Sequence, residues 1–475
     1  MKNIIKETKI PKFLNTEYKD FCLYVIESRG IPSAIDSITP VQRLILSNAQ
    51  PDFEKTLSLS GRCISDGYHH GDSSLNGAIG NLAKSYLSSF PILEMSGFAG
   101  NQVAPQPASP RYTRVRLNSK INTILKQYSS LNKYDEITEA RFPLNVDFPI
   151  GLLNVTMGIA VGFATSILPR KFDEIQKFLK GNENVELLPY FIDYSDNLDE
   201  NKGGKVVRDD ENPNKYTFYP NYEVLPDKNN IIIKISEVCP LLKLQSLLKK
   251  FEKFLTLYPK VKFINKSAEK IEINLIINKN YFTEELLNEA IKCCIVNFVE
   301  NITYTYNSKL IEYNNIKEYL TDFKRYSKEV VYINYLKYQK SVAEFNYKQL
   351  DWIIKFIKFM LEKKRIEDEI DEFLKTVDNN KIKNYLDGFK LRNCSITKLN
   401  EYKNELEKTY ININELSEKI DKCSKNVKIN GEYFVSTKNS KGDSNINELY
   451  EFMKEYEYQS DDIEENIFND LETEE

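Results

Sequence analysis

The sequence predicts a mixed α/β protein built from several domains. Its 475 residues, 41% apolar and 28% charged, correspond to about three domains at roughly 150 residues each. All 17 prolines lie at or before Pro259, and 14 of the 17 glycines lie at or before Gly204. Because these two residue types punctuate turn-rich folds, we predict a compact first half and a second half dominated by long helices.

Composition excludes several classes of protein. No apolar run reaches the roughly eighteen residues that a membrane-spanning helix requires, and the first twenty residues lack the apolar core of a secretory signal. The seven cysteines are an odd number without a Cys-x-x-Cys pair, which argues against a disulfide framework and a zinc site. We therefore expect a cytoplasmic protein with reduced thiols. A cysteine nucleophile is the alternative for one of them, although no nearby histidine supports it.

Charge is distributed unevenly along the chain. The formal net charge is −4, yet residues 451–475 hold eleven acids and one lysine, a net of −10, so residues 1–450 carry +6. The C-terminal tail is predicted to be largely disordered. It serves either solubility or competition with a polyanion for the basic body.

Apolar patterns predict the regular elements after the first 150 residues. Runs at 230–235 and 271–277 flank a helical pattern through 241–248, which predicts strand, helix and strand. Further on, apolar residues recur at steps of seven, four and three, as on one face of a long helix. These residues are Leu336, Ala343, Tyr347, Leu350, Ile354, Ile357 and Leu361.

A second long helix is predicted at 396–420, with a small helical knob at 365–394 between the two. The two helices form either an antiparallel coiled-coil arm or a hairpin packed on the core.

A basic window carries the clearest chemical pattern. From residue 95 to 134 the chain has no acid and six cations, a local charge that would attract phosphate. These cations are Arg111, Arg114, Arg116, Lys120, Lys126 and Lys133. Tyr112 lies among the three arginines. A phenol, with an ordinary pKa near 10, becomes a nucleophile at neutral pH only where cations or a metal stabilise the phenolate, and arginine also forks onto phosphate oxygens.

The only two histidines, His69 and His70, are adjacent and lie between Tyr68 and Gly71. This placement suggests hydrogen bonding to a reacting phosphate or leaving oxygen. Metal binding is a weaker alternative, because adjacent histidines diverge and no third ligand has a suitable spacing. A polar turn that caps a helix beginning near Asp72 and Ser73 is the simplest alternative.

Four sequence blocks occur in the order typical of one family. They are Ser28-Arg29-Gly30-Ile31-Pro32 with Asp36 and Pro40-Val41-Gln42-Arg43; Tyr68-His69-His70-Gly71-Asp72-Ser73; Ala108-Ser109-Pro110-Arg111-Tyr112-Thr113; and Gly158-Ile159-Ala160-Val161-Gly162-Phe163-Ala164-Thr165. On these blocks the chain resembles the DNA-cleavage subunit of type IIA DNA topoisomerases, and most closely the separate-subunit form found in large tailed bacteriophages. The likeness covers residues 18 to 170 well and the remainder mainly in layout.

The resemblance implies roles for individual residues. Tyr112 would attack the scissile phosphodiester and leave a 5′-phosphotyrosine, supported by Arg111, and Arg29 and His70 would contact the scissile phosphate. Ile159 would wedge between base pairs; without the resemblance, its segment reads as a buried strand. The other residues implied to bind DNA are Arg43, His69, Ser73, Arg114, Arg116 and Lys120.

The resemblance also implies the domain layout. Residues 1–153 would form a winged-helix DNA-cleavage domain, and 154–313 an α/β tower domain. Residues 314–425 would form the coiled-coil arm with an exit-gate knob that makes a homodimer, followed by the acidic tail at 426–475.

The sequence has neither a G-x-x-x-x-G-K-[ST] loop nor a D-x-D pair. The resemblance therefore implies that ATP and most of the Mg²⁺ coordination belong to a partner subunit with ATPase and Toprim domains, in an A2B2-like heterotetramer on double-stranded DNA. Without a long wrapping domain after residue 425, we expect relaxation and decatenation. Two alternatives remain: a non-catalytic coiled-coil DNA scaffold, and a tyrosine recombinase.

Overall fold

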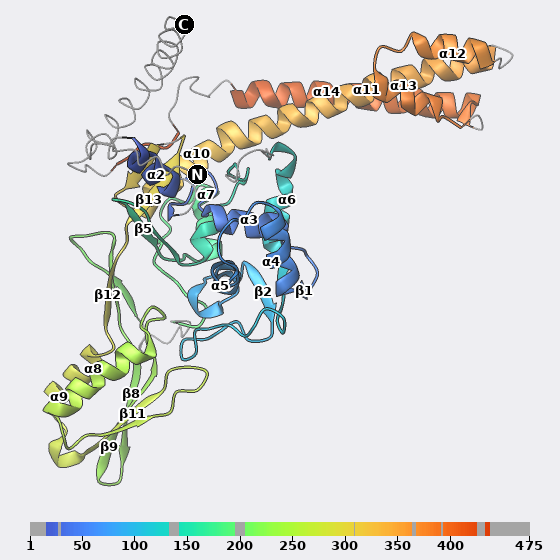
Figure 1. Ribbon diagram of the computed structural model, residues 1–475. Helices are drawn as coiled ribbons and strands as arrows, with labels where there is room; N and C mark the ends of the chain where they lie inside the picture. Colours follow the sequence, from blue (N-terminus) through green and yellow to red (C-terminus); the bar gives the residue numbers. More distant parts are fainter. Residues whose placement is uncertain are drawn as a thin grey trace, which may run out of the picture. The chain divides into compact units, whose positions relative to one another are not determined.

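The computed structural model describes residues 16–26, 30–132, 142–194, 205–307, 309–362, 367–390, 393–424 and 433–437. The chain divides into two compact units, and Figure 1 labels their elements. Unit 1 comprises Met1–Gln127, Asn132–Lys324 and Glu432–Glu475, and unit 2 comprises Tyr128–Leu131 and Arg325–Gly431. Both helices and small sheets are present, so the predicted mixed α/β class is confirmed.

The first part of unit 1 contains three mutually packed helices and a small sheet. The helices are α3 (Pro40–Asn48), α4 (Thr56–Ser65) and α5 (Asp72–Leu82). A capping box between Thr39 and Gln42, with Pro40 in the first turn, starts α3. The antiparallel sheet has the order β1-β3-β2, formed by Glu54–Lys55, Arg114–Leu117 and Leu93–Ser96. The central strand β3 therefore belongs to the basic window.

A β-hairpin and a three-stranded sheet follow in unit 1. The hairpin consists of β4 (Thr156–Ile159) and β5 (Ala164–Ile167), and α7 (Phe172–Leu179) comes next. The sheet has the order β12-β7-β6, formed by Val296–Val299, Lys215–Phe218 and Val206–Arg208. Its core includes the buried rings of Phe191, Tyr194, Tyr216 and Phe218.

A four-stranded antiparallel sheet carries the predicted strand-helix-strand pattern. Its order is β10-β11-β9-β8, formed by Lys262–Asn265, Ile273–Asn278, Asn230–Glu237 and Asn221–Asp227. Helices α8 (Leu244–Leu257) and α9 (Glu284–Lys292) lie along it (Figure 1). The helices bury Leu247, Phe251 and Ala290 in one core with Ile233 and Leu275 of the sheet. The predicted order of strand, helix and strand is confirmed, although the helix begins at Leu244 and an additional strand, β10, precedes β11.

The last hairpin of unit 1 is formed by β13 (Ile302–Tyr306) and β14 (Lys309–Tyr313), followed by α10 (Ile316–Tyr326). Residues 433–437 lie alongside β14, where the Thr437 N–H donates to the Glu312 carbonyl at 2.9 Å. Phe434 is buried against the rings of Tyr306 and Tyr319. Residues 433–437 are the only part of the predicted tail, 426–475, that the structure describes. The prediction that the rest of the tail is disordered lies outside the described residues.

Unit 2 contains the predicted pair of long helices, α11 (Ile333–Glu362) and α14 (Ile396–Ser424). Leu336 and Ala343 near the start of α11 pack with Leu416 near the end of α14, whereas Leu350 shares a core with Leu399 near the start of α14. This pairing makes the helices antiparallel.

The predicted apolar seam of α11 is correct at five positions: Leu336, Ala343, Leu350, Ile354 and Ile357 are buried. Tyr347 is half-buried. Leu361 is 43% exposed, so the prediction that it belongs to the seam is wrong. At this end Phe356 and Met360 are buried instead, because the helices of the predicted knob, α12 (Glu367–Lys375) and α13 (Asn380–Asp387), cover another side of α11.

Several short elements complete the described structure. They are α2 (Glu17–Val25), α6 (Ser119–Gln127), the 3₁₀ turns Ser85–Leu87, Ser129–Leu131, Ile150–Leu153 and Lys279–Tyr281, and a π-helical stretch Ser327–Tyr332. None of the helices in the described part of the chain is long and apolar enough to span a bilayer.

Candidate functional site

Tyr112 ends a tight turn that leads directly into β3. The turn is closed by the Tyr112 N–H, which donates to the Ser109 carbonyl at 2.9 Å. The tyrosine side chain is 78% exposed, and its hydroxyl makes no hydrogen bond to any other described residue. No other tyrosine in the described part of the chain is as exposed, and the exposure leaves the phenol oxygen accessible to a substrate.

The loop before this turn is fixed by its own hydrogen bonds. The Ala108 N–H donates to the Phe98 carbonyl at 2.9 Å. The Asn101 side-chain oxygen accepts from the N–H groups of Val103 and Ala104, at 3.0 and 2.7 Å. The turn that carries Tyr112 therefore follows a loop whose backbone is fixed by hydrogen bonds.

The basic residues near Tyr112 in the sequence differ in how many contacts their guanidinium groups make with other residues of the chain. Arg111 is exposed and has no ion pair within the described chain. Arg114 donates to the Phe53 carbonyl at 2.7 Å, although it remains exposed. Arg116 pairs with the Glu94 carboxylate at 2.6 Å and lies 4.4 Å from the centre of the Phe53 ring.

Lys120 is another exposed cation of this window, and its ammonium lies 3.6 Å from the centre of the Phe172 ring. Among these four cations, Arg111 combines sequence proximity to Tyr112 with an uncommitted guanidinium.

The two histidines lie in the turn between α4 and α5. His69 is exposed, and His70 is half-buried with its ring edge-on to Tyr68, 5.4 Å between centres. Helix α5 begins at Asp72, as expected. Its cap residue is Gly71 and no side chain caps it, so the alternative that this polar turn serves to cap the helix finds no side-chain hydrogen bond in its support. Ser73 lies exposed in the first turn of α5.

Ile159 ends strand β4, where it pairs with Ala164 across the hairpin. The connection is closed by the Ala160 N–H, which donates to the Phe163 carbonyl at 2.8 Å, and Gly162 adopts a left-handed φ of 80°. Ile159 is 86% exposed. The alternative of a buried strand is therefore wrong, because the apolar side chain at the tip projects into solvent.

The segment that follows Arg29 packs against this hairpin. A Cβ atom on Gly158 would lie 1.7 Å from the Gly30 carbonyl oxygen, so only glycine permits this approach. The contact brings the chain at Gly30 beside the strand that carries Ile159. Arg29 itself lies outside the described residues, so its predicted role stays a prediction.

Arg43 does not face solvent, contrary to prediction. Its guanidinium donates to both carboxylate oxygens of Asp36, at 2.7 and 3.0 Å, and to the Ile38 carbonyl at 3.1 Å. Both side chains are almost fully buried. The prediction that Arg43 approaches DNA is wrong for this structure, because its donors are used inside the fold.

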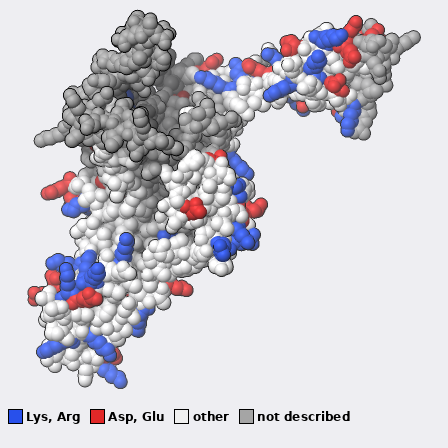
Figure 2. All heavy atoms as spheres, in the orientation of Figure 1, with Lys and Arg blue, Asp and Glu red and all other residues white. Residues whose placement is uncertain are grey.

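Sequence reasoning missed a second basic surface. Lys243, Lys249, Lys250 and Lys253 are exposed on or just before α8, and Figure 2 shows a group of basic side chains over this helix. The sequence could have predicted this surface, because three lysines within five residues share a helix whose opposite face is apolar.

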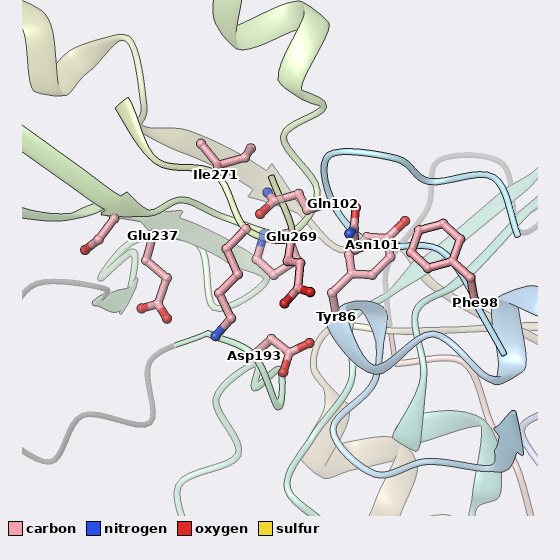
Figure 3. A pocket seen from close by; sticks show the side chains of 11 residues that line it. Tyr86, Phe98, Asn101, Gln102, Asp193, Glu237, Glu269 and Ile271 are labelled. Atoms are coloured by element: carbon pink, nitrogen blue, oxygen red, sulfur yellow. The ribbon is translucent and has the colours of Figure 1, made fainter. Parts of the chain in front are cut away.

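A cavity of about 300 Å³ also lies in unit 1 (Figure 3). Its lining includes Tyr86, Phe98, Asp193, Glu237 and Glu269 and none of the predicted site residues. Burial raises the pKa of the Tyr86 phenol. No group of three His, Cys, Asp or Glu side chains in the described residues is arranged to hold a metal ion.

The fold and this site define a class: a multidomain mixed α/β protein with an exposed Arg-Tyr turn, an exposed apolar hairpin tip and a long antiparallel helix pair. The sequence matches the family of DNA gyrase/topoisomerase IV A subunits over residues 29–433. This match covers most of the chain, and the protein belongs to that family.

Individual relatives match over shorter stretches. The DNA topoisomerase medium subunit of Enterobacteria phage T4 is 30% identical over 177 residues, 35% of this chain and 40% of the relative. The A subunit of DNA topoisomerase 4 from Staphylococcus aureus strain NCTC 8325 is 30% identical over 200 residues, 39% of this chain and 25% of the relative.

The A subunit of DNA gyrase from Borreliella burgdorferi is 28% identical over 264 residues, 49% of this chain and 32% of the relative. The matches thus span between a quarter and two fifths of these three relatives' own lengths.

Proposed function

We propose that this chain is the DNA cleavage and religation subunit of an ATP-dependent type IIA DNA topoisomerase. The observation that carries the proposal is the exposed Tyr112 hydroxyl on a hydrogen-bonded turn, next in the chain to Arg111 with its exposed and uncommitted guanidinium. Family membership and the named relatives support the same interpretation. The complex would break both strands of one duplex, pass another through, and reseal the break.

The proposed reaction exchanges one phosphodiester for another. The Tyr112 oxygen, having lost its proton, attacks the scissile phosphorus, and the bond from phosphorus to the 3′ oxygen breaks. The 3′ oxygen takes up a proton and leaves as a hydroxyl, while the 5′ phosphate stays on tyrosine. Arg111, with His70 and Arg29, would stabilise the charge on the pentacovalent phosphate. Resealing reverses these steps, so neither needs ATP.

The DNA path would involve other surfaces of unit 1. Helices α3 to α5 with the β1-β3-β2 sheet would act as the winged-helix domain, with His69, Ser73, Arg114, Arg116 and Lys120 near the backbone. Ile159 would enter between base pairs, which costs a few kcal/mol of unstacking and bends the duplex against more protein surface. The sheet with α8 and α9 would be the tower domain that extends the path.

The partner and the metal complete the proposal. A second polypeptide with ATPase and Toprim domains would hold ATP and most of the Mg²⁺ coordination, in an A2B2-like assembly. The helix pair α11–α14, with α12 and α13, would form the exit gate that joins two copies of this chain. We expect relaxation and decatenation as the net reactions, in the cytoplasm where the DNA lies.

Trapping of the covalent intermediate tests the proposal. The chain, its partner subunit, Mg²⁺ and supercoiled plasmid are mixed and then denatured. We expect protein linked to 5′ DNA ends, lost in Tyr112→Phe and retained in Tyr281→Phe, which alters a half-exposed tyrosine elsewhere. Undiminished trapping in Tyr112→Phe would refute the assignment. DNA binding without any adduct in the wild type would favour the non-catalytic scaffold instead.

A further inference from the structure

Tyr112 has little packing of its own, so its position depends on the backbone on either side of it. With the side chain 78% exposed, few neighbouring side chains can hold the phenol in place. Reactive groups need positions fixed to within a fraction of an ångström. The next residue, Thr113, is 1% exposed and is the nearest buried anchor after the turn.

Thr113 is bonded twice to one residue of α4. The Thr113 carbonyl accepts from the Thr56 N–H at 3.1 Å, and the two threonine hydroxyls are 2.8 Å apart. Thr56 is 2% exposed and is the first residue of α4, where backbone N–H groups have no partner within the helix. Thr113 supplies that partner from 57 residues along the chain.

The methyl group of Thr113 lies against Gly97. A Cβ atom on Gly97 would lie 3.1 Å from the Thr113 methyl carbon, and Gly97 has a left-handed φ of 111°. Thr113 is thus enclosed by a helix start and a glycine backbone. An enclosed hydroxyl pair has fixed rotamers, and losing one hydroxyl leaves the other unsatisfied.

We propose that Thr113 and Thr56 act as a positioning pair that sets the place of the Tyr112 nucleophile. This inference rests on the proposed function. Neither threonine touches the reacting atoms; each acts through the turn. Loss of one hydroxyl shifts or loosens the turn, which slows DNA cleavage while the DNA-binding surface remains.

Four variants in the complete assembly test the pair: Thr113→Val, Thr56→Val, the double variant, and Thr113→Ser. Valine keeps the shape and removes the hydroxyl, whereas serine keeps the hydroxyl. We measure the single-turnover rate of adduct formation and the DNA dissociation constant. Each valine variant should slow cleavage roughly 10- to 100-fold with an unchanged dissociation constant. The double variant should be no slower than either single one, and Thr113→Ser should be near wild type.

Thr303→Val is the matched control, because it removes a buried threonine hydroxyl from β13. It should cost similar thermal stability without slowing cleavage. A cleavage rate in Thr113→Val and Thr56→Val that equals the Thr303→Val rate would overturn the positioning role, as would additive losses in the double variant. If wild type forms no Tyr112 adduct, the proposed function itself fails, which is a distinguishable result.

Discussion

Arg170 and Glu300 form an ion pair that is completely buried inside unit 1. Their closest atoms, Nη2 and Oε2, are 2.6 Å apart, and neither side chain has exposed surface. Burial alone would lower the pKa of the Arg170 guanidinium, but the facing Glu300 carboxylate and the Tyr216 hydroxyl raise it above its ordinary value. The Glu300 carboxylate also accepts from the Leu168 N–H at 2.7 Å, so the pair ties the end of β5 to the end of β12.

Glu300→Gln should therefore destabilise the protein strongly. The variant leaves a buried guanidinium without its counter-charge, at a cost of about 3–5 kcal/mol in the free energy of unfolding. Replacing both partners, as Arg170→Met with Glu300→Leu, should recover much of the loss, because no unpaired charge remains. Urea unfolding of these variants and the wild type measures this. A loss below about 1 kcal/mol in Glu300→Gln would contradict the structure.

Arg43→Ala and Arg111→Ala should have opposite effects. Arg43 is buried on Asp36, so its removal should cost about 3–5 kcal/mol of stability and leave the salt dependence of DNA binding unchanged. Arg111 is exposed, so its removal should change stability by less than about 0.5 kcal/mol. If Arg111 meets a phosphate, the slope of log affinity against log salt should fall by about one.

Thermal melts and DNA titrations at several salt concentrations, below the melting temperature, distinguish the two variants. Arg43→Lys is a useful control, since lysine keeps the charge but cannot make the two-pronged contact. A salt slope reduced by Arg43→Ala rather than Arg111→Ala would restore the prediction that Arg43 approaches DNA.

Sequence patterns predicted elements well where one whole face of an element is buried along its length. The observed strands were predicted by the apolar alternation at 230–235 and 271–277, and the observed helix α11 by its apolar repeat. The patterns failed where a specific tertiary contact, rather than the repeat itself, decides the environment of a single side chain. Leu361 continues the repeat, yet α12 and α13 cover another side of α11 there. Arg43 lies in a motif of the family whose arginine was implied to bind DNA, yet Asp36 holds it inside the fold.

At the candidate site, too, some features were predicted from the sequence and others were not. Charge and residue type made Tyr112 and Arg111 candidates, the family resemblance implied their roles, and the structure leaves both accessible. The Thr56–Thr113 contact joins residues 57 positions apart, and periodicity says nothing about such a pairing. The exposure of Ile159 was not predictable from its apolar neighbours, because a hairpin tip and a buried strand share that composition.

Cys239 should be inert to thiol reagents in the folded protein. Burial raises the pKa of its thiol to about 12, so the reactive thiolate is a fraction of roughly 10⁻⁴ at pH 8. The folded-state value lies above the roughly 8.5 of an unfolded chain, so the thiol's contribution to stability is full below pH 8.5 and is lost as the pH rises towards 12.

Alkylation with iodoacetamide at pH 8, read by mass spectrometry of peptides, checks this. Cys239 should be modified only after denaturation, whereas the partly exposed Cys22 and Cys423 should react first. Rapid native labelling of Cys239 would show that this part of unit 1 opens readily.

Ile159→Ala should weaken DNA bending without unfolding the hairpin. The side chain is 86% exposed, so stability should change by less than about 0.5 kcal/mol. If the isoleucine inserts into a base step, its truncation removes about 1–2 kcal/mol of apolar contact, equivalent to roughly 5- to 30-fold weaker binding of the bent duplex. Energy transfer between dyes at the two ends of a short duplex reports the bend.

Met157→Ala is the matched control for this variant, because it removes another exposed apolar side chain from β4, two residues earlier on the same side of the strand. Ile159→Leu should retain most of the bend, since it keeps the apolar volume. Equal loss of bending in Met157→Ala and Ile159→Ala would mean that general contact with the hairpin matters and that Ile159 is no wedge.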